Sequence, residues 1–313
     1  MAQTRSADDT QPKRPGLSGN FKGALLLFVS GIGFTLYLLI NKLISDEVHW
    51  VVLSFWRAVF GMGLAVPFVL HSGIGILRTR RPGLLVMRSL FGTLGMTLAI
   101  FAVSDAFTLT LAQFNAISFT RPLFVTLLAA VILREVVGVH RWGAVLFGFI
   151  GVLVMVLPGL FVFWQPGALS DIGLDGGSLV ALISAFALAG AIVLVKFLTG
   201  ELSPIALLFY ANVLSTLILL PFTLFVIAPI RLEVWGFIAL MGIVGFGAQF
   251  CYIAAMSVGE ASFISPVDYL RLPMSSVADY FVFRLVPGFN VWVGAALIVV
   301  STLYIGWRER LKR

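Results

Sequence analysis

Two arginines lie inside long apolar stretches of the sequence. Arg121 directly precedes Pro122, and Arg271 lies two residues before Pro273. A charged side chain inside a membrane helix costs several kcal/mol unless it is paired or hydrated, so such residues commonly bind solutes or ions. A proline in a helix also removes a backbone hydrogen bond and raises the local polarity. We therefore expect Arg121 and Arg271 to bind an anionic group, such as a carboxylate, near the middle of a membrane.

One acidic residue accompanies these arginines. Asp268 lies three residues before Arg271, so the two side chains share one face of a helix. We expect Asp268 to be either a counter-ion or a proton-coupling carboxylate. The alternative is that Asp268 neutralises Arg121 and Arg271 in a purely structural cluster. Two arginines against one aspartate leave an unmatched positive charge, which favours an anionic or zwitterionic ligand.

Neutral polar side chains in similar apolar stretches complete the candidate set. The further substrate-binding candidates are Gln113, Asn115, Gln249 and Tyr269. We expect them to line a central polar cavity together with the two arginines. Arg57 and Arg88, by contrast, lie near the ends of apolar stretches, and we expect both to extend toward the membrane surface.

Motifs for other chemistry are missing from the sequence. Cys251 is the single cysteine, so neither an intrachain disulfide nor a cysteine-based zinc site is possible. The three histidines, His49, His71 and His140, are far apart in the sequence, which does not support a metal site. The nucleotide-binding pattern G-x-x-x-x-G-K-[ST] and the hydrolase patterns H-E-x-x-H and G-x-S-x-G do not occur. We therefore predict no metal, no cofactor and no catalytic residue.

The composition is that of a membrane protein. Hydrophobic residues make up 60% and charged residues 11% of the chain, and the mean hydropathy is +1.05. A soluble domain has about 25% charged residues, because its surface must face water. The formal net charge of +7 comes largely from short basic runs at the ends of apolar stretches. It therefore reports on orientation in a membrane and not on nucleic-acid binding.

The elements that position the candidate residues are membrane-spanning helices. A span needs about 20 mostly apolar residues. Ten segments fit, at residues 23–41, 50–70, 86–104, 109–132, 142–164, 177–196, 204–227, 235–256, 262–283 and 290–307. We therefore predict an all-α membrane protein with ten transmembrane helices.

The basic residues also predict how the helices are oriented. If the N-terminus is cytoplasmic, the outer loops and span ends carry only Lys42, Arg231 and Arg284. Most of the remaining lysines and arginines then lie on the cytoplasmic side, as the positive-inside rule requires. We expect a multi-pass protein of the inner (plasma) membrane with both termini in the cytoplasm.

An internal duplication divides the chain into two halves. At an offset of 154 residues, Gly23, Ser30 and Lys42 match Gly177, Ser184 and Lys196. At an offset of 150, Gly92-x-x-Gly95 matches Gly242-x-x-Gly245, and Pro122 matches Pro273 at 151. Because each half has an odd number of spans, the second half enters the membrane from the opposite side. Inverted repeats of this kind are common in secondary transporters.

The duplication sets the expected domain boundaries. The first five-helix repeat covers residues 21–164 and the second covers residues 177–308. Residues 165–176 form an outer linker. Residues 1–20 and 309–313 are expected to be cytoplasmic tails, the first of them disordered.

The segment from Pro122 to Met155 resembles the EamA module of the drug/metabolite transporter superfamily. The module has a proline, an aliphatic helix, a glutamate at its end, a basic residue and spaced glycines. Here these are Pro122, Glu135, Arg141, Gly143, Gly148 and Gly151. The second copy is similar, with Pro273 and Gly294, but it lacks a glutamate that members often have near Leu285–Val286.

The resemblance covers roughly residues 20–308 and implies both a fold and an activity. Members are similar in enclosing a central cavity between the two repeats, with the fifth and tenth helices at the periphery. They move amino acids and their derivatives, vitamins such as riboflavin, S-adenosylmethionine and drugs. The resemblance therefore implies transport of a small organic molecule.

The leading hypothesis is thus a secondary active transporter that works by alternating access, driven by protons or by exchange. The expected partners are a small-molecule substrate and membrane lipid, without nucleic acid, and the protein is expected to be a monomer or homodimer. The alternatives are an intramembrane enzyme, for which no catalytic motif was found, and a non-transporting membrane sensor or scaffold. The polar segments are too short for a signalling domain, which disfavours the last.

Overall fold

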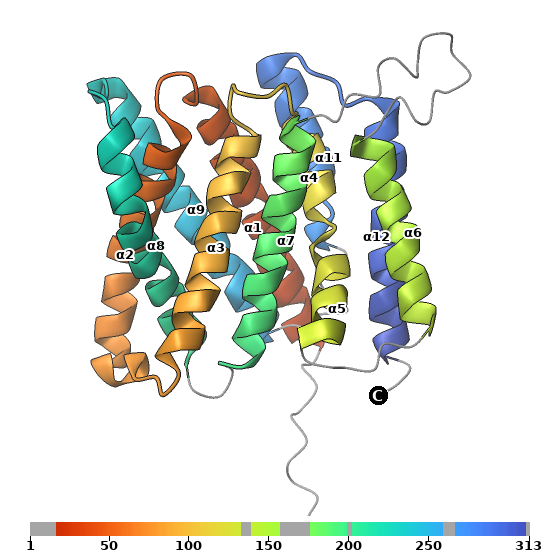
Figure 1. Ribbon diagram of the computed structural model, residues 1–313, viewed down its shortest axis with the longest axis horizontal. Coiled ribbons are helices and arrows are strands. Elements are labelled where there is room, and N and C mark those ends of the chain that lie inside the picture. Colours follow the sequence, from red (N-terminus) through yellow and green to blue (C-terminus); the bar gives the residue numbers. More distant parts are fainter. Residues whose placement is uncertain (1–16, 133–138, 157–175, 199–201, 259–266, 311–313) are drawn as a thin grey trace, which may run out of the picture.

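The structure is a computed structural model that describes residues 17–132, 139–156, 176–198, 202–258 and 267–310. In these ranges the regular elements are helices. They are α1 (Leu17–Leu43), α2 (Trp50–Ser72), η1 (Ile74–Leu77), α3 (Pro82–Ala102), α4 (Leu111–Ser118), α5 (Arg121–Ile132), α6 (Val139–Val156), α7 (Gly176–Lys196), α8 (Pro204–Val226), α9 (Leu232–Val258), α11 (Arg271–Ala278), η3 (Asp279–Phe283) and α12 (Phe289–Arg310). The all-α prediction is confirmed for these ranges (Figure 1).

Seven helical segments in the described ranges are long and apolar enough to cross a membrane. They comprise α1, α2, α3, α7, α8, α9 and the segment Leu111–Ile132, which contains α4 and α5. Shorter apolar helices occupy Trp142–Val154 and Phe289–Tyr304. The chain is therefore a multi-pass membrane protein. Of the predicted segments, residues 1–16, 157–175, 262–266 and 311–313 lie outside the described residues.

Helices of the two halves pack against one another in matched pairs. Helix α1 packs against α9, and its counterpart in the second half, α7, packs against α3. Helices α2 and α8 pack together, as do α4 with α11 and α6 with α12 (Figure 1). Each pair joins equivalent or exchanged positions of the two halves. This pattern is the one expected when two copies of a unit pack about a pseudo-twofold axis.

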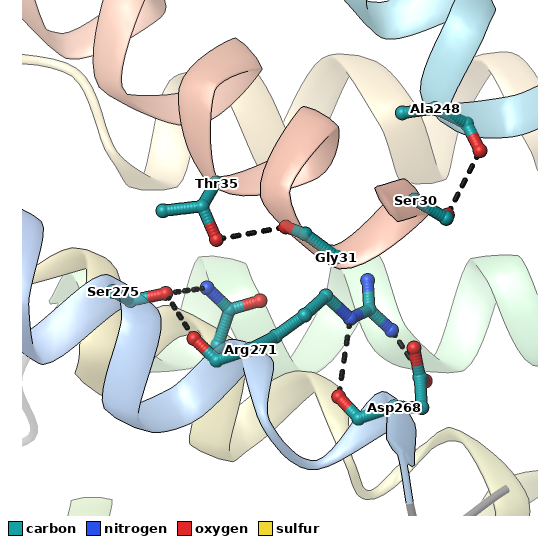
Figure 2. A network of polar contacts seen from close by, with 8 residues as sticks. Ser30, Gly31, Thr35, Ala248, Asp268, Arg271 and Ser275 are labelled. Atoms are coloured by element: carbon teal, nitrogen blue, oxygen red, sulfur yellow. Dashed lines mark hydrogen bonds and ion pairs between the residues drawn. The ribbon is translucent and has the colours of Figure 1, made fainter. Parts of the chain in front are cut away.

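Two serine hydrogen bonds fix the matched pairs in register. The Ser30 hydroxyl donates to the carbonyl of Ala248 at 2.8 Å, as Figure 2 shows. The Ser184 hydroxyl donates to the carbonyl of Gly95 at 2.7 Å. Because Ser30 and Ser184 are equivalent, Gly95 corresponds to Ala248, at an offset of 153 residues. The offset of 150 residues, chosen from the glycine pattern, therefore differs by three residues, nearly one helical turn, and is wrong. Glycine pairs recur along membrane helices, so a match between two of them does not fix which residues lie at the same level in the membrane.

The fourth predicted span is broken in its middle. Helix α4 ends at Ser118 and α5 begins at Arg121. Pro122 has no N–H to donate to the preceding turn, so an uninterrupted helix would leave a carbonyl without its partner. That carbonyl is the one of Ser118, four residues before Pro122. One residue earlier the chain forms a tight turn, in which the backbone N–H and the hydroxyl of Thr120 both donate to the carbonyl of Ile117, at 3.0 and 2.7 Å. The break places the start of α5, and with it Arg121, inside the bundle.

The second half has a comparable break. A turn at Tyr269 and Leu270 precedes α11, which begins at Arg271. Helix α11 then widens into the π-helix η3, which is followed by Arg284 in a left-handed backbone conformation (φ 56°). Both halves therefore start a short helix at an arginine that is followed closely by a proline.

Candidate substrate cavity

A cavity of about 240 Å³ lies at the centre of the helix bundle. Helices α2 and α8 form one wall, and α4, α5 and α11 form the opposite wall (Figure 1). The other two walls are α1 with α9 and α3 with α7. No described residue of α6 or α12 lines the cavity. This agrees with the peripheral fifth and tenth helices that the family resemblance implies.

The cavity is lined by cationic side chains. Its four charged lining residues are Arg57 on α2, Arg88 on α3, Arg121 on α5 and Arg271 on α11. Within the described residues, no aspartate or glutamate lines it. The Nε atoms of Arg57, Arg88 and Arg121 are buried and have no hydrogen-bond partner in the described part of the chain. Buried hydrogen-bond donors in proteins are normally paired. These cationic donors are not, so the cavity suits an anionic ligand that would accept their hydrogen bonds.

Arg271 is the most constrained of the four. Its side chain extends along α1, where a Cβ atom added to Gly31 would lie only 3.2 Å from the Arg271 Cγ. Its guanidinium donates from Nη2 to the Asp268 carboxylate at 2.5 Å and from Nε to the Asp268 carbonyl at 3.5 Å (Figure 2). The guanidinium also lies 5.2 Å from the ring centroid of Phe34, within cation–π range. Only 6% of Arg271 is exposed.

Arg121 lies close to this ion pair but does not join it. The charges of Arg271 and Asp268 both act on Arg121, one repelling and one attracting it. The only described ion pair in the group joins Asp268 to Arg271. The single carboxylate is therefore taken up by Arg271, and Arg121 keeps an unmatched positive charge that faces the cavity.

The structure brings together four of the seven predicted site residues. Arg121, Arg271, Asn115 and Gln249 line the cavity, whereas Gln113, Asp268 and Tyr269 are not among its lining residues. Asp268 contributes indirectly, through its ion pair with Arg271. Tyr269 packs edge-on against Phe119, with 4.9 Å between the ring centroids.

Asn115 has a positioning role in addition to its place in the cavity wall. Its amide nitrogen donates to the Ser275 hydroxyl at 2.6 Å and to the carbonyl of Leu111 at 3.1 Å. The Ser275 hydroxyl in turn donates to the carbonyl of Arg271 at 2.6 Å (Figure 2). This chain of hydrogen bonds holds α4 against α11 and fixes the backbone from which Arg271 extends.

The expectation that Arg57 and Arg88 reach the membrane surface is wrong. Both line the cavity with a buried Nε. Sequence position alone placed them near span ends, but their helices are turned so that the side chains point into the bundle. The sequence of α3 did contain a pattern that indicates this orientation. Polar and charged residues recur there at helical spacing and line the cavity together with Met96, namely Arg88, Ser89 and Thr93. Tyr37, Tyr252 and Asn212 also line it and were not expected.

Comparison with known proteins identifies relatives for both halves. Residues 21–157 and 175–307 each match the EamA-like transporter family. The chain is 32% identical to a riboflavin transporter of Brucella anthropi, over 82% of this chain and 87% of the relative. It is 30% identical to an S-adenosylmethionine uptake transporter of Rickettsia prowazekii, over 92% of this chain and 96% of the relative.

A more distant relative and a solved structure extend these findings. A pseudopaline exporter of Pseudomonas aeruginosa is 24% identical and covers 90% of this chain. One crystal structure, described only as that of a protein, is similar with a TM-score of 0.57 at 19% identity. The similarity covers 91% of this chain and 99% of that chain. At this identity the structural match shows the fold alone.

Proposed function

The chain belongs to the EamA-like transporter family, within the drug/metabolite transporter superfamily, and from this premise we propose that it is a secondary active transporter of an anionic or zwitterionic metabolite. It is a transporter and not an enzyme. The observation that supports the proposed substrate is the charge of the cavity. Four arginines line it, and the one carboxylate nearby, that of Asp268, does not line it and is paired with Arg271.

The proposed architecture is ten transmembrane helices in two inverted five-helix repeats. The segments of the first repeat are α1, α2, α3, α4 with α5, and α6; those of the second are α7, α8, α9, α11 with η3, and α12. The matched packing of α1 with α9 and of α7 with α3 supports this arrangement. Both termini would then lie in the cytoplasm, in an inner membrane.

The proposed mechanism is alternating access around the central cavity. Inverted repeats can exchange their two conformations, and this exposes a site at their interface to each side in turn. The cavity lies at such an interface, because its walls combine helices of both halves. The break between α4 and α5 supports the proposal, since its irregular backbone lies at Phe119 and Thr120, which are buried inside the protein and away from lipid.

The relatives narrow the proposed substrate to small organic molecules. The names riboflavin transporter and S-adenosylmethionine uptake transporter suggest a vitamin-like or amino-acid-like solute. Arg121 would bind the acidic group of the solute. Arg271 would contribute indirectly, by neutralising the Asp268 carboxylate so that it does not repel the solute. Proton coupling through Asp268, or exchange of one solute for another, would drive transport.

Uptake into proteoliposomes tests this function. The purified protein should accumulate at least one labelled solute from a panel of amino acids, vitamins and nucleoside derivatives. Arg121→Ala should reduce uptake at least tenfold, because it removes a charge-assisted hydrogen bond that contributes about 1.5–3 kcal/mol. Arg271→Ala should also reduce uptake, because it leaves the Asp268 carboxylate without its partner and that negative charge then repels an anionic solute. The matched control is Arg231→Ala, since Arg231 pairs with Glu47 at the surface and is 67% exposed. Wild-type uptake by both cavity variants would refute the proposed site.

A further inference from the structure

Two of the cavity arginines extend from opposite walls. Arg57 belongs to α2, which packs against α3, α8 and α9. Arg121 belongs to α5, which packs against α6 and α7 (Figure 1). Both side chains line the same cavity, and both have a buried Nε without a partner in the described residues. The cavity therefore has two separate cationic ends.

The end at Arg57 has two buried donors without a hydrogen-bond partner in the described residues, the Arg57 Nε and the Tyr37 hydroxyl. Arg57 and Tyr37 also interact electrostatically. A small extension of the cavity, about 20 Å³ in volume, is lined by Arg57, Tyr37, Asn212 and Gln249. A buried donor that stays unpaired costs about 1–3 kcal/mol, and more when it is charged. The groups at this end therefore suit an anionic acceptor.

The end at Arg121 has its own unmatched charge. The Asp268 carboxylate is bound to Arg271, so Arg121 and Arg271 together exceed their counter-ion by one positive charge. This second end also suits an anionic acceptor.

The surface between the two ends is apolar and partly aromatic. It includes Phe34, Leu38, Met96, Ala99 and Phe114. Arg57 acts electrostatically on Tyr37, whereas the charged groups that act on Arg121 are Arg271 and Asp268. A guanidinium contacts a carboxylate at about 2.7–2.9 Å, so each arginine needs an acidic group placed close to it. Arg88 lines the cavity from a third wall, on α3, and its Nη1 donates to the carbonyl of Leu207 at 3.5 Å.

We infer that the cavity selects a solute with an acidic group at each of its two ends and an apolar middle, such as a medium-chain dicarboxylate. One acidic group binds Arg57 and the Tyr37 hydroxyl, and the other binds Arg121. The apolar middle packs against Phe34 and Phe114. This inference rests on the proposed function and narrows its substrate class from anionic or zwitterionic solutes to doubly acidic ones.

Binding of a dicarboxylate series to the purified protein tests the inference. Isothermal titration should measure the straight-chain dicarboxylates from succinate to suberate and, for each, the monocarboxylate of equal carbon number. One chain length should bind at least tenfold more tightly than its monocarboxylate, because only a matching length reaches both walls. Arg57→Gln and Arg121→Gln should each remove that preference, whereas Arg231→Gln at the surface should keep it.

A milder variant protects the test against loss of folding. Tyr37→Phe removes only the buried hydroxyl and should weaken dicarboxylate binding severalfold while monocarboxylate binding stays constant. Equal affinities for both classes, no dicarboxylate binding, or unchanged preference in Arg57→Gln and Tyr37→Phe would each overturn the inference. Uptake of a singly acidic solute that depends on Arg121 would overturn it too, while leaving the proposed transport function intact.

Discussion

The Asp279 carboxylate accepts a hydrogen bond from the backbone N–H of Ala112 at 2.8 Å and so ties the second half of the chain to the first turn of α4. Its other oxygen accepts from the N–H of Leu111 at 3.0 Å. Asp279 is fully buried, and the nearby Lys42 ammonium attracts its charge. Lys42 itself donates to the carbonyl of Leu109 at 2.7 Å. These contacts join α1, α4 and η3 at one end of the bundle.

Removing the Asp279 charge should destabilise this end of the protein. In Asp279→Asn the amide NH₂ replaces one acceptor and faces a backbone N–H, so one buried donor loses its partner. We expect a loss of about 2 kcal/mol, in line with hydrogen bonds to charged groups. Thermal unfolding of the variant and the wild type in detergent measures this loss of stability. Asp105→Asn is the matched control, because Asp105 is exposed, and an equal loss in both variants would contradict the role of Asp279.

Much of the helix content follows from the sequence, because a run of apolar residues of membrane length has few other structures open to it. The span expected at residues 50–70 is the helix Trp50–Ser72, and the span expected at 204–227 is Pro204–Val226. The break between α4 and α5 was not placed, although Pro122 and Thr120 contain its cause. A proline indicates a disturbed helix, but it does not specify the residue at which the backbone turns.

The site was less predictable, because it depends on how the helices are rotated. Arg121 and Arg271 were predicted because they lie near the middle of apolar spans, and both line the cavity. Arg57 could not be predicted as a cavity residue, because its direction depends on how α2 packs against α8 and α9, and no local sequence pattern specifies that packing. The bond from Ala112 to Asp279 joins residues 167 positions apart, so only the tertiary fold reveals it.

A glycine on α1 should control how closely the two halves approach. A Cβ atom added at Gly33 would lie 2.8 Å from the Cβ of Ala248 on α9, which is closer than two methyl groups can approach. We expect Gly33→Ala to cost about 1–3 kcal/mol, as overpacking does, and to lower uptake. Thermal unfolding and uptake assays measure both effects.

The matched control for this variant is Gly63→Ala on α2. A Cβ atom at Gly63 would meet nothing within 4 Å, and alanine has the higher helix propensity. The control should therefore be as stable as the wild type or slightly more stable. A Gly33→Ala protein with wild-type stability would show that α1 and α9 can separate without cost.

Cysteine labelling should reveal which loops face the cytoplasm. Cys251→Ser removes the single cysteine, and new cysteines can then be placed at Asp46, between α1 and α2, and at Gly75, in η1. Both positions are exposed. With a cytoplasmic N-terminus, a membrane-impermeant maleimide should label Asp46→Cys in intact cells and Gly75→Cys only after permeabilisation. The reverse pattern would invert the proposed orientation.

Asp268 should distinguish proton coupling from a purely structural ion pair. Its carboxylate binds Arg271 at 2.5 Å and keeps 22% of its side chain exposed, so the ion pair is not sealed from its surroundings. An amide cannot exchange a proton, so Asp268→Asn should abolish the stimulation of uptake by an imposed pH gradient. Exchange of labelled for unlabelled solute should continue, because it requires no net proton movement. Asp46→Asn, at an exposed carboxylate, should leave both activities unchanged. Full stimulation in Asp268→Asn would assign the aspartate to holding Arg271 in place and would move proton coupling elsewhere.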